Sequence, residues 1–248
     1  MRVILRFIDL VFLIDRASVA IQTDVVDVFI RELERLRAEE QSYDCRYSTG
    51  TQLLTRIGNW RGKVVVFSDE ELDGSSWFQD QSFVINDPVG LREQFDQIQT
   101  TRGSEKSSSA LDALHKVIAG GRRSSVTEES QSQWSPHATR HIILITDRSC
   151  KGSMTYTEGV GGNVTDVCNE LMEERIQLTI FAPEFECYEH LSETDKSVMC
   201  CPADGDSASS ILEDEMRVLV GNLMDGACSP EFAYDPKMNK GWRYEDEI

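Results

Sequence analysis

The stretch VFLIDRASVAIQTD, residues 11–24, decides the fold of this 248-residue chain. Four apolar residues lead directly into Asp15, and a polar segment suited to opening a helix follows almost at once. A dense apolar run without alternation is typical of a strand that is buried on both faces of a parallel sheet. The stretch therefore predicts a strand, a loop and a helix, with Asp15 at the carboxyl end of the strand.

The same pattern recurs along the chain. Short runs rich in Val, Ile and Phe lie at 4–14, 63–68, 141–146, 176–182 and 197–201. Stretches with apolar residues at helical spacing lie at 25–40, near 88–99, at 107–121, and near 164–173 and 207–225. Strands that alternate with helices predict an α/β fold with one doubly wound, mostly parallel central sheet flanked by helices.

The chain reads as a single domain over residues 1–226, followed by a C-terminal tail over 227–248. The tail mixes Pro, aromatic and charged residues without a period, and we expect it to be disordered or to dock on another surface. The Ser-rich segment 122–138 is nearly free of apolar residues and is expected to be a mobile surface loop.

Charge limits the classes of partner. The formal net charge of -18 would repel nucleic-acid phosphates and anionic membrane surfaces, so neither is expected as a partner. Arg2, Arg6 and Asp9 interrupt the first apolar run, which argues against a signal peptide or a membrane span. We expect a soluble protein with a cytoplasmic location.

Seven cysteines are scattered along the chain without a CxxC pair. This spacing does not favour a zinc site, and a secreted disulfide framework would be denser in so short a chain. We therefore expect reduced thiols, several of them buried as small apolar groups, which agrees with a cytoplasmic location.

Acidic residues end three of the predicted strands, namely Asp15, Asp69 and Asp147. In an open α/β sheet, ligands bind beyond the carboxyl ends of the strands. If the first strand and the strand at 141–146 are neighbours, Asp15 and Asp147 meet there and must share a proton or a cation such as Mg²⁺. The alternative is that each Asp caps the helix that follows its strand.

A strand ending in Asp15, VVVFSD at 64–69, GSEKSSSALDAL at 103–114 and RHIILITD at 140–147 together resemble a von Willebrand factor A (VWA) domain. The resemblance spans about residues 9–225. In detail, the chain is similar to bacterial cytoplasmic members of the family that are found with tellurite-resistance and kinase or phosphatase genes. The resemblance implies a metal-ion-dependent adhesion site, whose metal completes its coordination with a carboxylate from a protein partner.

The first loop of this implied site departs from the family pattern, in which D-x-S-x-S supplies one carboxylate and two hydroxyls. Asp15 matches the carboxylate, but the two Ser positions are Ala17 and Val19. Ser18 falls between them. The resemblance therefore implies a degenerate site that has lost two oxygen ligands.

The other two parts of the implied site are altered as well. The family's Thr falls on Glu105, with Ser104 and Ser107 within reach, and the Gly of the T-D-G turn is Arg148. Glu105 would strengthen a cation site, whereas the guanidinium of Arg148 would instead take the place of the metal and pair with both aspartates. The implied metal ligands are Asp15, Glu105 and Asp147.

A binding module is the interpretation that the sequence favours. We expect a non-enzymatic protein–protein interaction module that acts as a scaffold or adaptor in a bacterial stress or defence system, with no cofactor or with Mg²⁺. The chain contains no G-x-S-x-G elbow and no phosphate-binding loop. The residues expected to contact the partner are Ser18, Ser104, Ser107, Arg148 and Trp134.

Two alternatives stay open. One is a Mg²⁺-dependent hydrolase or phosphate-transfer enzyme that uses the carboxylates at the sheet edge. The other is a structural subunit whose crevice is closed by Arg148. Trp134 likewise allows two interpretations, an exposed partner anchor or a side chain folded back onto the sheet.

Overall fold

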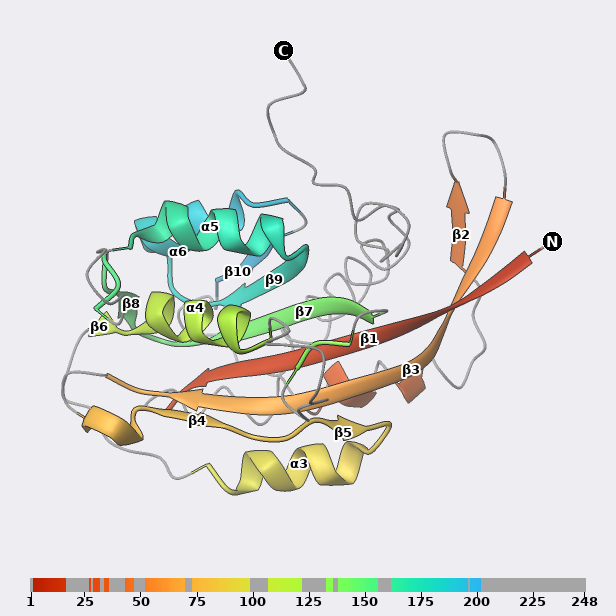
Figure 1. Ribbon diagram of the computed structural model, residues 1–248, viewed down its shortest axis with the longest axis horizontal. Coiled ribbons are helices and arrows are strands. Elements are labelled where there is room, and N and C mark those ends of the chain that lie inside the picture. The colour runs from red at the N-terminus through yellow and green to blue at the C-terminus, as the bar shows by residue number, and fades with distance from the viewer. Residues whose placement is uncertain are drawn as a thin grey trace, which may run out of the picture.

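The computed structural model describes residues 2–16, 27, 29–31, 34–35, 43–46, 52–69, 73–98, 107–121, 133–135, 138–155, 162–195 and 197–201. These residues form a mostly parallel sheet with helices on both faces, which confirms the predicted α/β fold class (Figure 1). The predicted boundary near 226 and the tail at 227–248 lie outside the described residues.

The main sheet has eight strands, six of them in the order β10-β9-β7-β1-β3-β2, while β4 and β5 pair with β3. The strands are β1 (Arg2–Asp15), β2 (Tyr43–Arg46), β3 (Gln52–Phe67), β4 (Phe78–Asp80), β5 (Val84–Ile85), β7 (Ala138–Ile145), β9 (Ile176–Phe181) and β10 (Val198–Cys200). A separate small sheet pairs β6 (Ser107–Ser108) with β8 (Ser149–Cys150). The helices whose bounds lie in the described residues are η1 (Gly74–Ser76), α3 (Pro88–Asp96), α4 (Ala110–Gly121), α5 (Val164–Glu173) and α6 (Glu186–Ser192).

Strand β1 lies between β7 and β3 and runs parallel to both. Ile14 pairs with Ile145, and Asp15 pairs with Phe67, so the three strands end at the same level. The strands preceding Asp15 and Asp147 are therefore neighbours, which is the condition under which the two aspartates lie at the same edge. The carboxyl edge of the sheet is therefore where the candidate site lies.

Both β1 and β3 are longer than the apolar runs indicated. The first part of β3, residues 52–62, is too polar to be recognised from its pattern, yet its backbone pairs with β1 along most of its length. The register shifts between Arg6 and Phe7, where β3 carries one extra residue, Gly58. Such a bulge bends the strand and increases its twist locally.

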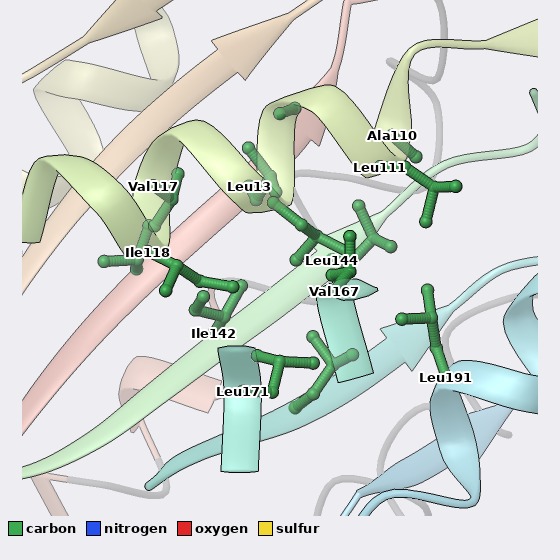
Figure 2. Close-up of a cluster of buried hydrophobic side chains, with 14 of the residues drawn as sticks. Leu13, Ala110, Leu111, Val117, Ile118, Ile142, Leu144, Val167, Leu171 and Leu191 are labelled. Atoms are coloured by element: carbon green, nitrogen blue, oxygen red, sulfur yellow. The ribbon is translucent and has the colours of Figure 1, made fainter. Parts of the chain in front are cut away.

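Alternate side chains of β1 point to opposite faces of the sheet and pack into two apolar layers. On one face, Ile8, Leu10, Phe12 and Ile14 pack with Leu91 and Phe95 of α3 and with Phe29 and Ile30. On the other face, Val11 and Leu13 pack with residues of β7, α4, α5 and α6 (Figure 2). Burial on both faces explains why the sequence of β1 is almost continuously apolar.

Local signals set the starts of two helices. The side chain of Asp87 accepts a hydrogen bond from the backbone N–H of Gly90, and Pro88 opens α3. Asn163 and Asp166 form a reciprocal capping box at the start of α5. Each cap satisfies backbone N–H groups that the first turn of a helix leaves without a partner.

Trp134 belongs to the layer beneath α4. Its side chain is 5% exposed, and its backbone N–H donates to the carbonyl oxygen of Gly121 at 3.4 Å. A Cβ atom added to Gly121 would lie 1.8 Å from the Trp134 ring, so glycine permits this close approach. Trp134 is therefore packed against the fold, the second of the two interpretations, and is not an exposed partner anchor.

This contact predicts opposite outcomes at two adjacent glycines. Gly121→Ala should lower the free energy of unfolding by about 1–3 kcal/mol because the new methyl group overlaps the indole ring. Gly120→Ala is the matched control, since no atom lies within 4 Å of a Cβ atom at that position. We expect it to be neutral or to stabilise the helix by up to about 1 kcal/mol. Urea unfolding measures both, and equal effects would contradict the packing.

Burial of His141 in β7 gives the stability a pH dependence. Burial lowers the pKa of His141 from its ordinary 6.5 to about 4, and Nε2 lies 2.8 Å from Oγ1 of Thr179. Between these two values the unfolded chain binds a proton at this residue and the folded protein does not. Stability contributed by the neutral imidazole is therefore lost as the pH falls below 6.5.

We expect the wild-type protein to lose about 2 kcal/mol more stability between pH 7 and pH 5 than the His141→Gln variant. Urea unfolding of both proteins at the two pH values measures the difference. Equal losses would show that His141 does not bind a proton on unfolding over this range.

Candidate functional site at the carboxyl ends of β1 and β7

The carboxyl ends of β1 and β7 bring together residues from two distant parts of the sequence. Asp15 is the last residue of β1, and Thr146, Asp147 and Arg148 follow directly after β7. Asp15 is fully buried, whereas Asp147 is exposed. The two aspartates therefore lie at the same edge but in different environments.

Hydrogen bonds from Arg148 and Thr146 hold the carboxylate of Asp15. Nε of Arg148 donates to Oδ2 at 2.9 Å, and Nη2 of Arg148 donates to Oδ1. Thr146 Oγ1 also donates to Oδ2 at 2.9 Å. A fork-to-fork pair of this kind fixes both side chains and neutralises a charge that would be costly to bury alone.

Arg148 supplies a permanent positive charge to this edge. Burial lowers the pKa of its guanidinium, but the hydrogen bonds that it donates to Asp15 and the charges of Asp15, Asp147 and Asp69 outweigh burial and raise that pKa. The side chain of Arg148 is only 10% exposed. The guanidinium therefore acts as a fixed cation above the ends of the strands.

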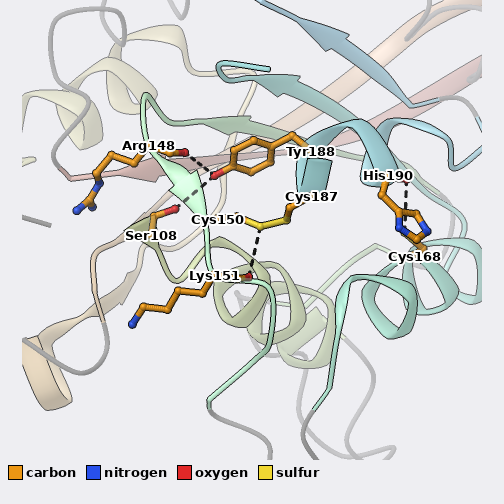
Figure 3. The surroundings of a disulfide bond; sticks show 8 residues. All are labelled: Ser108, Arg148, Cys150, Lys151, Cys168, Cys187, Tyr188 and His190. Carbon is orange, nitrogen blue, oxygen red and sulfur yellow. Dashed lines mark hydrogen bonds between the residues drawn. A yellow bond between two sulfur atoms is a disulfide. The ribbon is translucent and has the colours of Figure 1, made fainter. Parts of the chain in front are cut away.

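The backbone of Arg148 is held by α6. The hydroxyl of Tyr188 donates to the carbonyl oxygen of Arg148 at 2.9 Å, and it lies 3.4 Å from Oγ of Ser108 (Figure 3). Tyr188 is fully buried, and burial raises its pKa. Its hydroxyl therefore stays protonated and is suited to donating a hydrogen bond.

A second ion pair lies at the end of β3. Nζ of Lys151 contacts Oδ1 of Asp69 at 2.9 Å, and Asp69 is 2% exposed. Nη2 of Arg16 donates to the carbonyl oxygen of Ser76 at 3.2 Å. The segment after β7 thus supplies cations to the acidic residues at the ends of β1 and β3, since Arg148 binds Asp15 and Lys151 binds Asp69.

The structure places some of the predicted site residues together. Ser107 joins Asp15, Asp147 and Arg148 at this edge, because β6 pairs with β8 and Ser107 is aligned with Ser149. Trp134 lies elsewhere, since its neighbour Ser135 donates to Asp9, six residues before Asp15 in β1. The predicted residues Ser18, Ser104 and Glu105 lie outside the described residues, as do Ala17 and Val19.

The donor set in the described part of the chain does not fit a metal ion. Both oxygens of Asp15 accept hydrogen bonds from the guanidinium, which places a positive charge where a divalent cation would have to sit. Among the described residues, no group of three His, Cys, Asp or Glu side chains is arranged to hold a metal. The ligand set Asp15, Glu105 and Asp147 stays a prediction because Glu105 is not described.

Two residues near Arg148 correct the expectation of reduced thiols. Cys150 and Cys187 form a disulfide with their Cα atoms 6.3 Å apart (Figure 3). They are 37 residues apart in sequence, and only the packing of β8 beside α6 brings them together. Cys168 is a buried free thiol, as expected. The cysteine pattern therefore no longer argues for a cytoplasmic location.

Tyr188 and Lys151 are two contributors at this edge that sequence reasoning missed. Both act through tertiary contacts, with Tyr188 reaching Arg148 and Lys151 reaching Asp69. The available signal for Tyr188 was its apolar spacing with Leu191 in a short helix. Nothing in the local sequence marks Lys151.

Among the helices that the structure describes, none is long and apolar enough to cross a membrane.

No protein-family model matches the chain, and no curated protein matches it. Among solved structures, the crystal structure of the SpRpn10 VWA domain is similar to this chain at 10% sequence identity with a TM-score of 0.47. The alignment covers 84% of this chain and 94% of that one. A likeness at this level carries no argument about function.

Proposed function

We propose that this protein is a non-enzymatic protein-interaction module that binds a partner protein through the loops at the carboxyl ends of β1 and β7. The observation that supports this proposal is the pair formed by Asp15 and Arg148. The carboxylate at the centre of the edge is fully buried and held by an internal cation. Held in this way, Asp15 is not poised to bind a metal or to accept a proton from a substrate.

The groups around this pair also have structural partners. Lys151 contacts Asp69, and the hydroxyl of Tyr188 donates to a backbone carbonyl oxygen. The exposed residues on the segment after β7 include Asp147, Gly152 and Ser153. A small, polar and rigidly supported surface suits recognition by shape and charge better than chemistry on a bound substrate.

The proposed biological system, location and state of the adhesion site rest on the sequence. The VWA-like motifs suggest a scaffold or adaptor in a bacterial stress or defence system, with a cytoplasmic location and an adhesion site that has lost its metal. The net charge of -18 and the exposed Asp147 favour a partner with a basic face. Such a complex would form quickly and weaken as salt is added.

Reversing one charge at this edge tests the proposal. Asp147→Arg should weaken partner binding about tenfold or more, because a like charge would then face the basic partner. Glu173→Arg is the matched control, since Glu173 is also exposed but ends α5, just before β9 begins at the opposite edge of the sheet.

The measurement is quantitative affinity purification of the tagged full chain from its own cells, followed by titration of the recovered partner. The partner should be retained by the wild type and by Glu173→Arg and depleted with Asp147→Arg. Equal recovery with both variants would contradict the proposal. Hydrolysis of a phosphoester by the purified protein with Mg²⁺, lost in Asp147→Ala, would establish the enzyme alternative instead.

A further inference from the structure

The disulfide lies on the segment that carries Arg148. Cys150 ends β8, two residues after Arg148, and Cys187 lies in the first turn of α6, next to Tyr188. Tyr188 holds the carbonyl oxygen of Arg148. The disulfide and this hydrogen bond therefore both join the segment at 148–150 to the start of α6 (Figure 3).

Besides the disulfide, weaker non-covalent contacts hold the segment at 147–151. The backbone N–H of Lys151 donates to the carbonyl oxygen of Ser108 at 3.1 Å, and β6 and β8 pair over only two residues each. A pairing of two residues on each strand contributes little to stability by itself. The covalent link therefore keeps the segment against α6 when these hydrogen bonds open.

We propose that the Cys150–Cys187 disulfide is a redox-controlled latch on the segment that positions Arg148 over Asp15. Both cysteines are partly exposed, so a reductant can reach them. A dithiol donates two electrons and two protons, the bond between the two Sγ atoms breaks to give two thiols, and the dithiol leaves as its own disulfide.

Opening the latch loosens Arg148. With the covalent link gone, residues 147–151 depart from α6 more often, and each departure removes the guanidinium from the buried carboxylate of Asp15. The local change does not depend on the proposed function. Its effect on partner binding rests on the proposed function, because the same segment is the proposed recognition surface.

Amide hydrogen exchange of the full chain tests the latch without any partner. The backbone amide of Lys151 should exchange at least about tenfold faster after treatment with dithiothreitol than in the oxidised protein. The amide of Leu178, in the centre of the buried strand β9, should keep its protection in both states. Failure of the proposed function would leave this result unchanged.

Cysteine variants assign the effect to one bond. Cys150→Ser and Cys187→Ser should each exchange at Lys151 as fast as the reduced wild type and should not respond to dithiothreitol. Cys168→Ser is the control and should respond as the wild type does, because Cys168 is a free thiol on α5. Equal protection of Lys151 in oxidised and reduced wild type, or recovery of Cys150 and Cys187 as free thiols from the untreated protein, would overturn the proposal.

Discussion

Replacing Arg148 by methionine is expected to lower the free energy of unfolding by about 3–5 kcal/mol, because it leaves a buried carboxylate without its counter-charge. Asp15 is 0% exposed and takes two of its hydrogen bonds from Arg148. Methionine keeps much of the aliphatic stem and removes the charge. Urea unfolding at neutral pH measures the loss.

A second arginine provides the matched control. Arg92 of α3 also pairs with an aspartate, Asp27, but the two side chains are 55% and 38% exposed. Arg92→Met should therefore cost less than about 1 kcal/mol. Asp15→Asn in the Arg148→Met background should recover part of the stability, since the uncompensated charge is then gone. Equal losses for the two arginine variants would contradict the role given to Arg148.

The other large effect is expected in the apolar layer beneath α3. Phe12 of β1 makes edge-to-face contacts with Phe29 and Phe95, with ring centroids 5.7 Å and 5.3 Å apart. Phe12→Ala should lower the free energy of unfolding by about 3–5 kcal/mol, because it removes a buried ring and leaves a cavity. Urea unfolding again provides the measurement.

The control for Phe12 lies on the same strand. Phe7 is 41% exposed, so Phe7→Ala removes a ring that is partly in contact with water. Its cost should stay well below that of Phe12→Ala, at about 1 kcal/mol or less. Comparable costs would mean that β1 is not the central strand of the core.

The fold was predictable where burial leaves a strong pattern in the sequence. Strands β1, β7 and β9 are buried on both faces and read as dense apolar runs, and α4 and α5 carry clear apolar stripes. The first part of β3 and the short strands β2, β4, β5, β6 and β8 were not predicted. Pairing with β1 stabilises the polar part of β3, and such pairing leaves little local trace in composition.

The site was predictable in position but not in its contacts. The rule for open α/β sheets pointed to the carboxyl ends of the strands, but it left open whether the strands before Asp15 and Asp147 are neighbours, which the structure shows. The resemblance left open whether Glu105 strengthens a cation site or the guanidinium of Arg148 replaces the cation, and the structure shows that guanidinium bound to Asp15. The link between Cys150 and Cys187 could not be predicted, because it depends on how α6 packs beside β8.

If the guanidinium of Arg148 takes the place of a metal ion at the carboxyl edge of the sheet, as we propose, no divalent cation should bind there. Thermal unfolding of the oxidised wild type in EDTA and in excess Mg²⁺, Mn²⁺ or Ca²⁺, repeated on Asp147→Ala, measures whether a cation binds. A metal at a hundred times its dissociation constant would add about 2.7 kcal/mol and raise the melting temperature by a few degrees. We expect the same melting temperature in all four solutions, and a rise that Asp147→Ala abolishes would show that a metal ion binds beside Arg148.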